Sequence, residues 1–532
     1  MKLLNKILGI SVSAFMILFV SSCADLAVEN KNEPSQGQVI TTPSDVVALV
    51  EGAWANYALY SQAYHTSPLL VQADWYTGTV GNFWVNDAGH EEGTIGVDRE
   101  RVESYPNTPT TSYPTVVDFH WTYYYRALFN VNTAISILDA GDVTFSEADK
   151  LQLKATAQLL QGIIYGSVGL IFDKGYIIDE ESDVLNLSFD DYETMVTAAV
   201  EKLDDAMATA DAANSAGSPG VSDAIIPLLG TLDERIASAE SIDWSEFKQI
   251  ASTYASSFLA QAPRTTAEYD AVDWDAVLSY ANDGITFDFA PYSDDNNWIP
   301  LVIFYMNNDW FRVDMKIVNK LDPNQPLYWP TTDGQNGQGE DAPEIVSEDA
   351  RFGTDYIQSY DWSVFNPTRG YFKRSHVIFD RYNEFLSGVW DDPLPIMMRA
   401  QNNLLIAEAE LNTNGDLGNA IEKINDTRVG RGELEPLTIL SSEADIREAL
   451  EYEWDIEVAI TGPSTLSPWY NKRRWGQLLK GSMLHLPVPA GELGIVEQDY
   501  YTFGGGGEGS APKINPNALK IDTENRKTFS IK

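Results

Sequence analysis

The amino-acid sequence predicts an all-α fold in which pairs of helices carry long irregular insertions. Apolar residues recur at three- and four-residue spacing along eight segments, which is the period of an amphipathic helix. Most of these segments follow one another in pairs across short turns, and each pair can bury its apolar stripe only against its neighbours. The connections between pairs are long and rich in aromatic residues, so we expect them to be ordered.

The predicted helices form about four pairs. They span residues 44–60 with 117–138, 147–172 with 192–208, 244–260 with 274–281, and 397–412 with 417–429. In the first helix Val46, Val50, Trp54 and Tyr57 share one face, and Ser44 is placed to cap its N-terminus. Four long non-helical stretches remain, at 61–116, 209–243, 284–392 and 460–532.

The N-terminus has the composition of a secretory signal. Lys2 and Lys6 precede a short apolar run, and Ser21-Ser22-Cys23 closes it. Small residues before a cysteine resemble a bacterial lipoprotein processing site, so Cys23, the only cysteine in the chain, is the expected lipidation site. We therefore expect a signal peptide over residues 1–22, a flexible lipid-anchored tether over 23–41, and a single globular domain over 42–532. No later stretch has the roughly 20 apolar residues of a membrane span.

The net charge of −43 excludes some classes of partner. Nucleic-acid binding needs clustered Lys and Arg to contact phosphates, and the chain has 35 basic residues against 78 acidic ones. Polyanionic ligands are disfavoured by the same field unless a local basic patch overrides it.

Three ordered stretches carry a family resemblance. The first is Arg399 to Glu410, followed by Gly415 and by Ala420 to Gly432; the second is Ile446 to Glu457; the third is Trp469 to Gly476, followed by Leu486-Pro-Val-Pro489. Together with the lipoprotein signal, this set resembles the SusD-like (RagB) family over nearly the whole chain. One departure is Leu450-Glu-Tyr-Glu-Trp454, where the family is richer in arginine.

The resemblance implies a tetratricopeptide-like all-α body at the outer-membrane surface. Members of the family bind oligosaccharides, serve as lids on SusC-like TonB-dependent barrels, and have no catalytic centre. The arginines of the family-like motifs are expected to pair with core carboxylates rather than with ligand; these are Arg399, Arg428, Arg473 and Arg474.

Two insertions have the residues that a sugar site needs, namely flat aromatic rings for the apolar face of the sugar and polar groups for its hydroxyls. One contains Gln72 to Tyr76 and Asn82 to Asp87; the other contains Ser293 to Trp298, Phe304 to Arg312 and Leu327 to Pro330. The predicted carbohydrate-binding residues are Trp75, Trp84, Trp298 and Trp310 for stacking, with Asp74, Asn308, Asp309 and Arg312 for hydroxyl contacts.

Other tryptophans have different expected roles. Those on amphipathic faces are expected to pack in the core; they are Trp54, Trp121, Trp244, Trp274, Trp454 and Trp475. Weaker ligand candidates are Trp329, Trp362 and Trp390.

Enzymatic and metal-binding motifs are absent from the sequence. There is no Gly-x-Ser-x-Gly turn and no His-Glu-x-x-His, and the five histidines are scattered without metal-ligand spacing. We therefore expect no catalytic residues, no cofactor and no metal. The acidic pairs Asp294-Asp295 and Asp391-Asp392 could hold a structural calcium ion through oxygen ligands, although solvated turns explain them better.

The leading functional prediction is capture of an oligo- or polysaccharide and its delivery to a SusC-like TonB-dependent transporter. The acidity favours a neutral glucan, for example an algal β-1,3-glucan such as laminarin. Peptide binding for import, as in the RagB branch, is an alternative from another class, and a surface glycoside hydrolase is a third.

Overall fold

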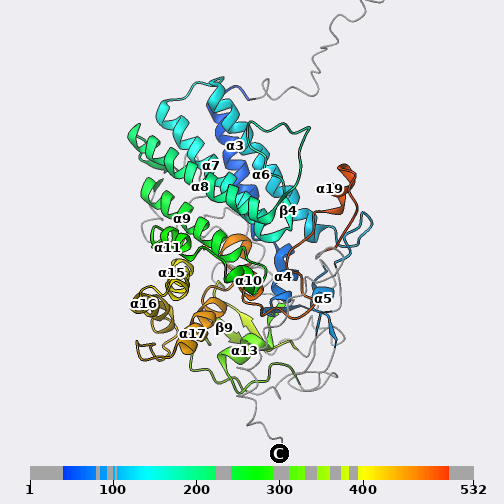
Figure 1. Cartoon of the computed structure of the whole chain (residues 1–532), viewed down its shortest axis with the longest axis vertical. Coiled ribbons are helices and arrows are strands. Elements are labelled where there is room, and N and C mark those ends of the chain that lie inside the picture. Colours follow the sequence, from blue (N-terminus) through cyan, green and yellow to red (C-terminus); the bar gives the residue numbers. More distant parts are fainter. Residues whose placement is uncertain are drawn as a thin grey trace, which may run out of the picture.

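The predicted helices are present, and they pack in the predicted pairs. The computed structural model describes residues 40–78, 84–92, 100–101, 105–222, 241–290, 311–329, 344–359, 373–382 and 394–502. The four pairs are α3 (Pro43–Ser61) with α6 (Thr115–Ala140), α7 (Glu147–Ile171) with α8 (Tyr192–Ser215), α9 (Trp244–Gln261) with α11 (Trp274–Asn282), and α15 (Arg399–Thr413) with α16 (Leu417–Arg428). Successive pairs also touch, so the helices form one continuous layer (Figure 1).

Shorter elements lie in the insertions and toward the C-terminus. The remaining α-helices described are α4 (Ser67–Gln72), α5 (Val85–Ala88), α10 (Thr266–Tyr269), α13 (Met315–Leu321), α17 (Glu443–Ile456), α18 (Ser467–Arg474) and α19 (Ala490–Ile495). Single 3₁₀ turns occur at Tyr64–Thr66 and Pro463–Thr465. None of the helices in the described ranges combines the length and apolar character that crossing a bilayer would require.

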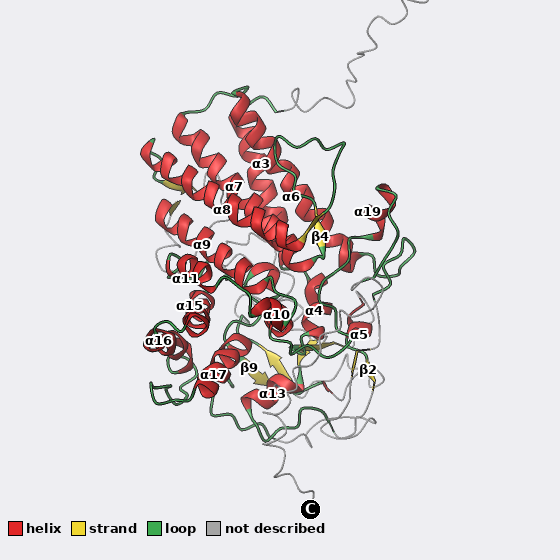
Figure 2. Ribbon diagram, in the orientation of Figure 1, coloured by secondary structure: helices red, strands yellow, loops and turns green. Residues whose placement is uncertain are grey.

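Strands make only small antiparallel ladders, drawn in yellow in Figure 2. The ladders of the described chain are β1 (Tyr76–Gly78) with β8 (Phe311–Val313), β2 (Glu91–Glu92) with β3 (Glu100–Arg101), β4 (Lys174–Gly175) with β5 (Asp190–Asp191), β6 (Gly220–Ser222) with β7 (Ser241–Asp243), and β9 (Tyr356–Gln358) with β10 (Val377–Phe379). The helix-dominated structure confirms the predicted all-α class.

Side-chain caps explain where the helices begin. At α3 the hydroxyl of Thr42 accepts the Asp45 N–H, and the Asp45 carboxylate accepts the Thr42 N–H, which is a complete capping box. Pro43 occupies the first helical position, where the missing N–H costs nothing. The prediction of Ser44 as the cap was therefore wrong, because the capping residue lies two positions earlier, at Thr42. Asp243 and Glu246 form the same box at α9.

The core contains five of the six tryptophans that were predicted from helical spacing; the sixth, Trp475, is partly buried and packs against the edge of the core. Trp54 and Trp454 are fully buried, and Trp121, Trp244 and Trp274 are at most 7% exposed. Close helix packing also needs small residues. A side chain at Gly166 of α7 would collide with the Phe258 ring of α9, so only glycine fits this crossing.

The motif arginines divide into two kinds. Arg474 is buried and pairs with the buried Glu408 at 2.6 Å, as predicted, whereas Arg399 pairs at 3.0 Å with Asp426, which is 32% exposed and therefore not a core carboxylate. Arg473 instead donates to the carbonyl oxygens of Leu170, Gln261 and Leu484, and Arg428 donates to that of Glu435. For these two the predicted carboxylate partner was wrong. Their guanidinium groups satisfy main-chain acceptors where the chain leaves regular structure.

A buried arginine ties the insertion at 344–359 to α17. The Arg351 guanidinium lies 2.7 Å from Asp349, 2.7 Å from Glu453 and 3.0 Å from Glu457, and each of these side chains is at most 1% exposed. Thr427 of α16 donates to Glu453 at 2.8 Å. Because the carboxylates are removed from water, Asp349 and Glu453 depend on this cation for compensation, whereas Glu457 is also paired with Arg381 and Arg431.

We expect Arg351→Ala to lower the free energy of unfolding by about 3–5 kcal/mol, because it leaves buried carboxylates without their shared partner. Lys248→Ala is the control, since Lys248 forms an exposed ion pair with Asp211. Its loss should cost no more than about 1 kcal/mol. Urea denaturation of both variants measures the difference; equal midpoints would contradict the assigned role of Arg351.

Candidate ligand-binding site

The two insertions predicted to bind ligand meet at the β1–β8 ladder. Tyr76 pairs with Val313, Thr77 with Arg312 and Gly78 with Phe311. β1 begins at Tyr76 of the first candidate window and β8 begins at Phe311 of the second, so segments far apart in the sequence become neighbours. This pairing gives both windows a common rigid base.

Beneath the ladder lies a cluster of buried charges. Asp74 pairs with Arg101 at 2.6 Å and with Lys316 at 2.6 Å, while Glu91 pairs with Arg101 at 2.7 Å and with Lys373 at 2.9 Å. Burial alone would raise the pKa of Asp74, but Lys316 and Arg101 outweigh that effect and hold its pKa below the ordinary value. The cluster joins five separate segments of the insertions.

Asp74 therefore does not have the role predicted for it. Its side chain is buried, and its backbone adopts a left-handed conformation with φ of 53°. Both carboxylate oxygens are engaged, one by Arg101 and the other by Lys316. The hydroxyl contact predicted for Asp74 is incompatible with this placement.

Trp75 is a core residue in the structure. It is fully buried, and its indole N–H donates to the carbonyl oxygen of Asp455 at 2.9 Å. Its ring meets the rings of Tyr76 and Phe379 edge to face. A ring in this position offers no face to a ligand, so the predicted stacking role does not hold for Trp75.

Trp84 and Arg312 are also buried. Trp84 is 2% exposed, has φ of 60°, and packs edge to face against Tyr105. Arg312 in β8 is 1% exposed. Neither can reach a ligand at the surface in this arrangement, which contradicts the predicted stacking of Trp84 and the predicted hydroxyl contact of Arg312. Trp329, a weaker candidate, is 6% exposed and donates to the Arg374 carbonyl oxygen at 2.7 Å.

The remaining predicted residues lie outside the described part of the chain. They are Trp298, Asn308, Asp309 and Trp310 of the binding site, Trp362 and Trp390 of the weaker candidates, Cys23 of the lipid anchor, and the two acidic pairs considered for calcium. Within the described ranges no group of three or more His, Cys, Asp or Glu side chains converges as a metal site would require.

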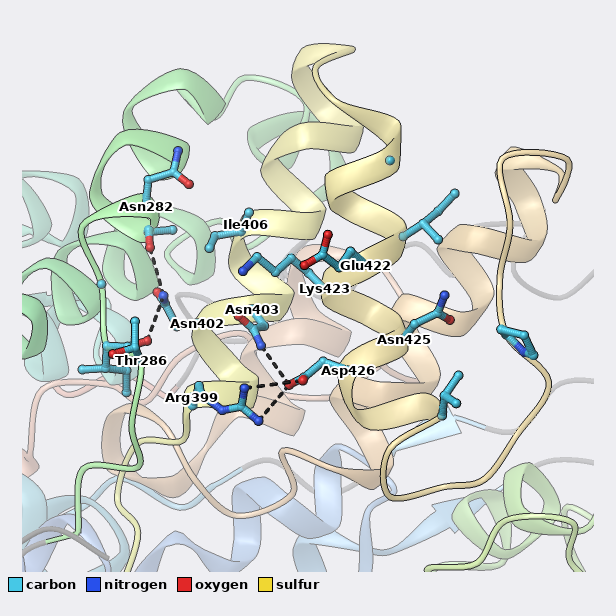
Figure 3. Close-up of a pocket in the computed structure, with 17 residues that line it drawn as sticks. Asn282, Thr286, Arg399, Asn402, Asn403, Ile406, Glu422, Lys423, Asn425 and Asp426 are labelled. Carbon is cyan, nitrogen blue, oxygen red and sulfur yellow. Dashed lines mark hydrogen bonds and ion pairs between the residues drawn. The ribbon is translucent and has the colours of Figure 1, made fainter. Parts of the chain in front are cut away.

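A separate concave site lies on the helical layer. A groove of about 850 Å³ is lined by residues of α11 and the turn after it, of α15 and of α16 (Figure 3). Arg399 and Asn403 both point toward Asp426, and the side chain of Lys423 leaves α16 and lies across the groove (Figure 3). This site was not predicted from the sequence. Its one available signal was the run of polar residues inside the family-like motif at 399–426.

An acidic side chain stands beside the charge cluster. Asp314 accepts the Lys316 N–H at 2.9 Å and so caps α13, but its Oδ2 atom is buried without a hydrogen-bond partner among the described residues. Burial raises the pKa of Asp314, and the Asp74 carboxylate raises it further, whereas Lys373 and Lys316 oppose the shift. The carboxyl is therefore neutral over a wider pH range than usual.

We expect Asp314→Asn to reduce the loss of stability with rising pH. Because the pKa is higher in the folded than in the unfolded chain, the contribution of Asp314 is complete below about pH 4 and declines as pH rises through the folded-state pKa. Asparagine keeps the cap and stays neutral, so the variant should unfold at higher urea than the wild type at pH 8 and at similar urea at pH 4. Parallel pH profiles would contradict this account.

We expect Trp75→Ala to lower the free energy of unfolding by about 3–5 kcal/mol, as truncation of a large core residue does. The matched control is Phe129→Ala on α6, because Phe129 is 61% exposed and an exposed truncation changes stability by about 0.5 kcal/mol or less. Urea titrations report both values. A wild-type midpoint for Trp75→Ala would restore the surface role predicted for this residue.

Comparison with known proteins gives different results for the sequence and for the structure. Neither a protein-family model nor a curated protein matches the chain. A SusD superfamily protein from Parabacteroides distasonis matches it with a TM-score of 0.56 at 11% identity, covering 85% of this chain and 97% of that one. A SusD-like carbohydrate binding protein from Bacteroides fragilis has a TM-score of 0.54 at 14% identity, covering 82% and 86%.

A third structure extends the match along the chain. It is a SusD superfamily protein from Bacteroides thetaiotaomicron, with a TM-score of 0.51 at 13% identity, and it covers 91% of this chain and 98% of that one. The three matches cover 82–91% of this chain and 86–98% of the neighbours, and the resemblance seen in the motifs is confirmed at the level of the fold. The chain has the SusD-like fold.

Proposed function

We propose that the protein captures a neutral oligo- or polysaccharide at the cell surface and passes it to a SusC-like TonB-dependent transporter, without chemical conversion of the glycan. The observation that supports this most directly is the β1–β8 ladder, which joins the two aromatic-rich windows on the side of a SusD-like helical layer. The lipoprotein-like N-terminus supports a lipid anchor at Cys23 and a place on the outer membrane.

The residues proposed to contact the glycan are now fewer than the sequence predicted. Trp75, Trp84, Asp74 and Arg312 form the base of the site, because their side chains are buried. Trp298 and Trp310 remain the proposed stacking residues, with Asn308 and Asp309 as hydroxyl partners. β8 begins at Phe311, directly after Trp310 in the sequence, and is fixed to β1.

The charge of the chain supports a neutral substrate. With 78 acidic and 35 basic residues, the protein repels uronic-acid polymers unless a local patch compensates. A neutral glucan such as laminarin meets no such barrier.

We expect Trp298→Ala and Trp310→Ala each to weaken binding of a neutral gluco-oligosaccharide about tenfold or more, since each removes an aromatic platform worth about 1.5 kcal/mol or more. Isothermal titration calorimetry gives the affinities. Phe129→Ala is the control, because it removes an exposed aromatic ring on α6 that belongs to neither window. Wild-type affinity in both tryptophan variants would reject the proposed platform, and binding of peptides but no glycan would reject the proposed function.

A further inference from the structure

The groove on the helical layer has walls from three helices. Its lining begins at Ala281 and Asn282 of α11, continues through Gly284, Ile285 and Thr286 of the following turn, and includes residues of α15 and α16. Its volume of about 850 Å³ lies within the range of small-molecule sites. The loop windows contribute none of its lining residues, so the groove is distinct from the site proposed above.

Polar side chains with unused bonding capacity line the groove. Asn282, Glu422 and Lys423 form no side-chain hydrogen bond or ion pair with other described residues. The Arg399–Asp426 pair is half-exposed, with side-chain exposures of 47% and 32%, so it presents donors and an acceptor to the groove. Asn403 holds Asp426 in place with a hydrogen bond of 3.0 Å.

The floor of the groove is aliphatic. It is made by Ile285, Ile406 and Ile421, all of which are buried. Asn402, also buried, donates to the carbonyl oxygens of Ala281 and Ile285 and so fixes the turn after α11 against α15 (Figure 3). None of the 17 lining residues is aromatic.

The balance of charge argues for an uncharged ligand. Arg399 and Lys423 are matched by Glu422 and Asp426, so the lining carries no net charge. An anionic group would gain little there. The described lining residues lie in helices, turns and loops and none lies in a strand, so an extended peptide would find no strand edge to join. What remains is a set of donors and acceptors above an aliphatic floor, which suits hydroxyl groups that both donate and accept.

We propose that this groove is a second binding site for neutral oligosaccharides, which recognises hydroxyl groups from the edge of the sugar rather than by stacking. This inference rests on the proposed function of glycan capture and extends it. Because the groove has no aromatic platform, it binds more weakly than the loop site. Two sites on one chain increase the affinity for a long polymer, since the second contact becomes intramolecular.

The test counts binding sites. Native mass spectrometry and calorimetry with a neutral β-1,3-gluco-hexaose should find two sites on the wild-type chain and one on Asn282→Ala/Lys423→Gln. Trp298→Ala/Trp310→Ala should keep only the weak site, and combining all four substitutions should abolish binding. Affinity of the groove variant for the long polymer should fall about tenfold or more through lost avidity.

The control variant makes the same two types of substitution, Lys→Gln and Asn→Ala, on a different helix. Lys202→Gln/Asn214→Ala changes two residues of α8 that do not line the groove, and it should keep two sites. Thermal melting establishes that every variant folds.

The possible failures are distinguishable. One site on the wild type, lost in the loop variant and unchanged in the groove variant, overturns the groove proposal but leaves glycan capture intact. Absence of glycan binding in the wild type overturns both. If Asn282→Ala/Lys423→Gln removes peptide binding instead, the groove belongs to peptides and the proposal is wrong.

Discussion

Buried ion pairs hold the insertions of this protein to its helical layer, and the geometry of the candidate site depends on them. Arg351 joins the segment at 344–359 to α17. The cluster around Asp74 and Arg101 joins the segments that flank the β1–β8 ladder, which connects both ligand windows. A buried charged side chain is stabilised only when an oppositely charged partner lies close to it in a well-defined geometry. Irregular segments, which lack a repeating main-chain pattern of their own, thereby acquire fixed positions.

The helical layer was predictable because the residues that determine each helix lie close together in the sequence. Apolar spacing places the eight paired helices within a few residues of their observed ends. The exception is α8, which continues seven residues beyond the predicted end at 208. The capping residues Asp243 and Ser146 stand in the sequence directly before α9 and α7. The pairing of neighbours follows from short turns and from the need to bury each stripe. The first pair shows that even a long insertion does not prevent this, since α3 still packs on α6.

The site was less predictable because it is determined by contacts between residues that lie far apart in the sequence. Trp75 lies among polar residues in the sequence, yet its indole bonds to the carbonyl oxygen of Asp455, far along the chain. Asp74 likewise finds Lys316 in a distant segment. Local composition cannot distinguish a buried tryptophan that fixes a loop to the core from an exposed tryptophan that binds a ligand. The groove was missed for the same reason, because three helices must assemble before its lining residues converge.

The pairing of Gly78 with Phe311 has a consequence for the order of folding. This contact closes a chain segment that contains two of the four helix pairs, α7–α8 and α9–α11, together with α6 of the first pair. Closing so long a segment costs conformational entropy that local helix formation does not, and contacts of high sequence separation form slowly. The helices that precede β8 can therefore form early, whereas the β1–β8 ladder forms only after residues 311–313 have found a partner made much earlier in synthesis.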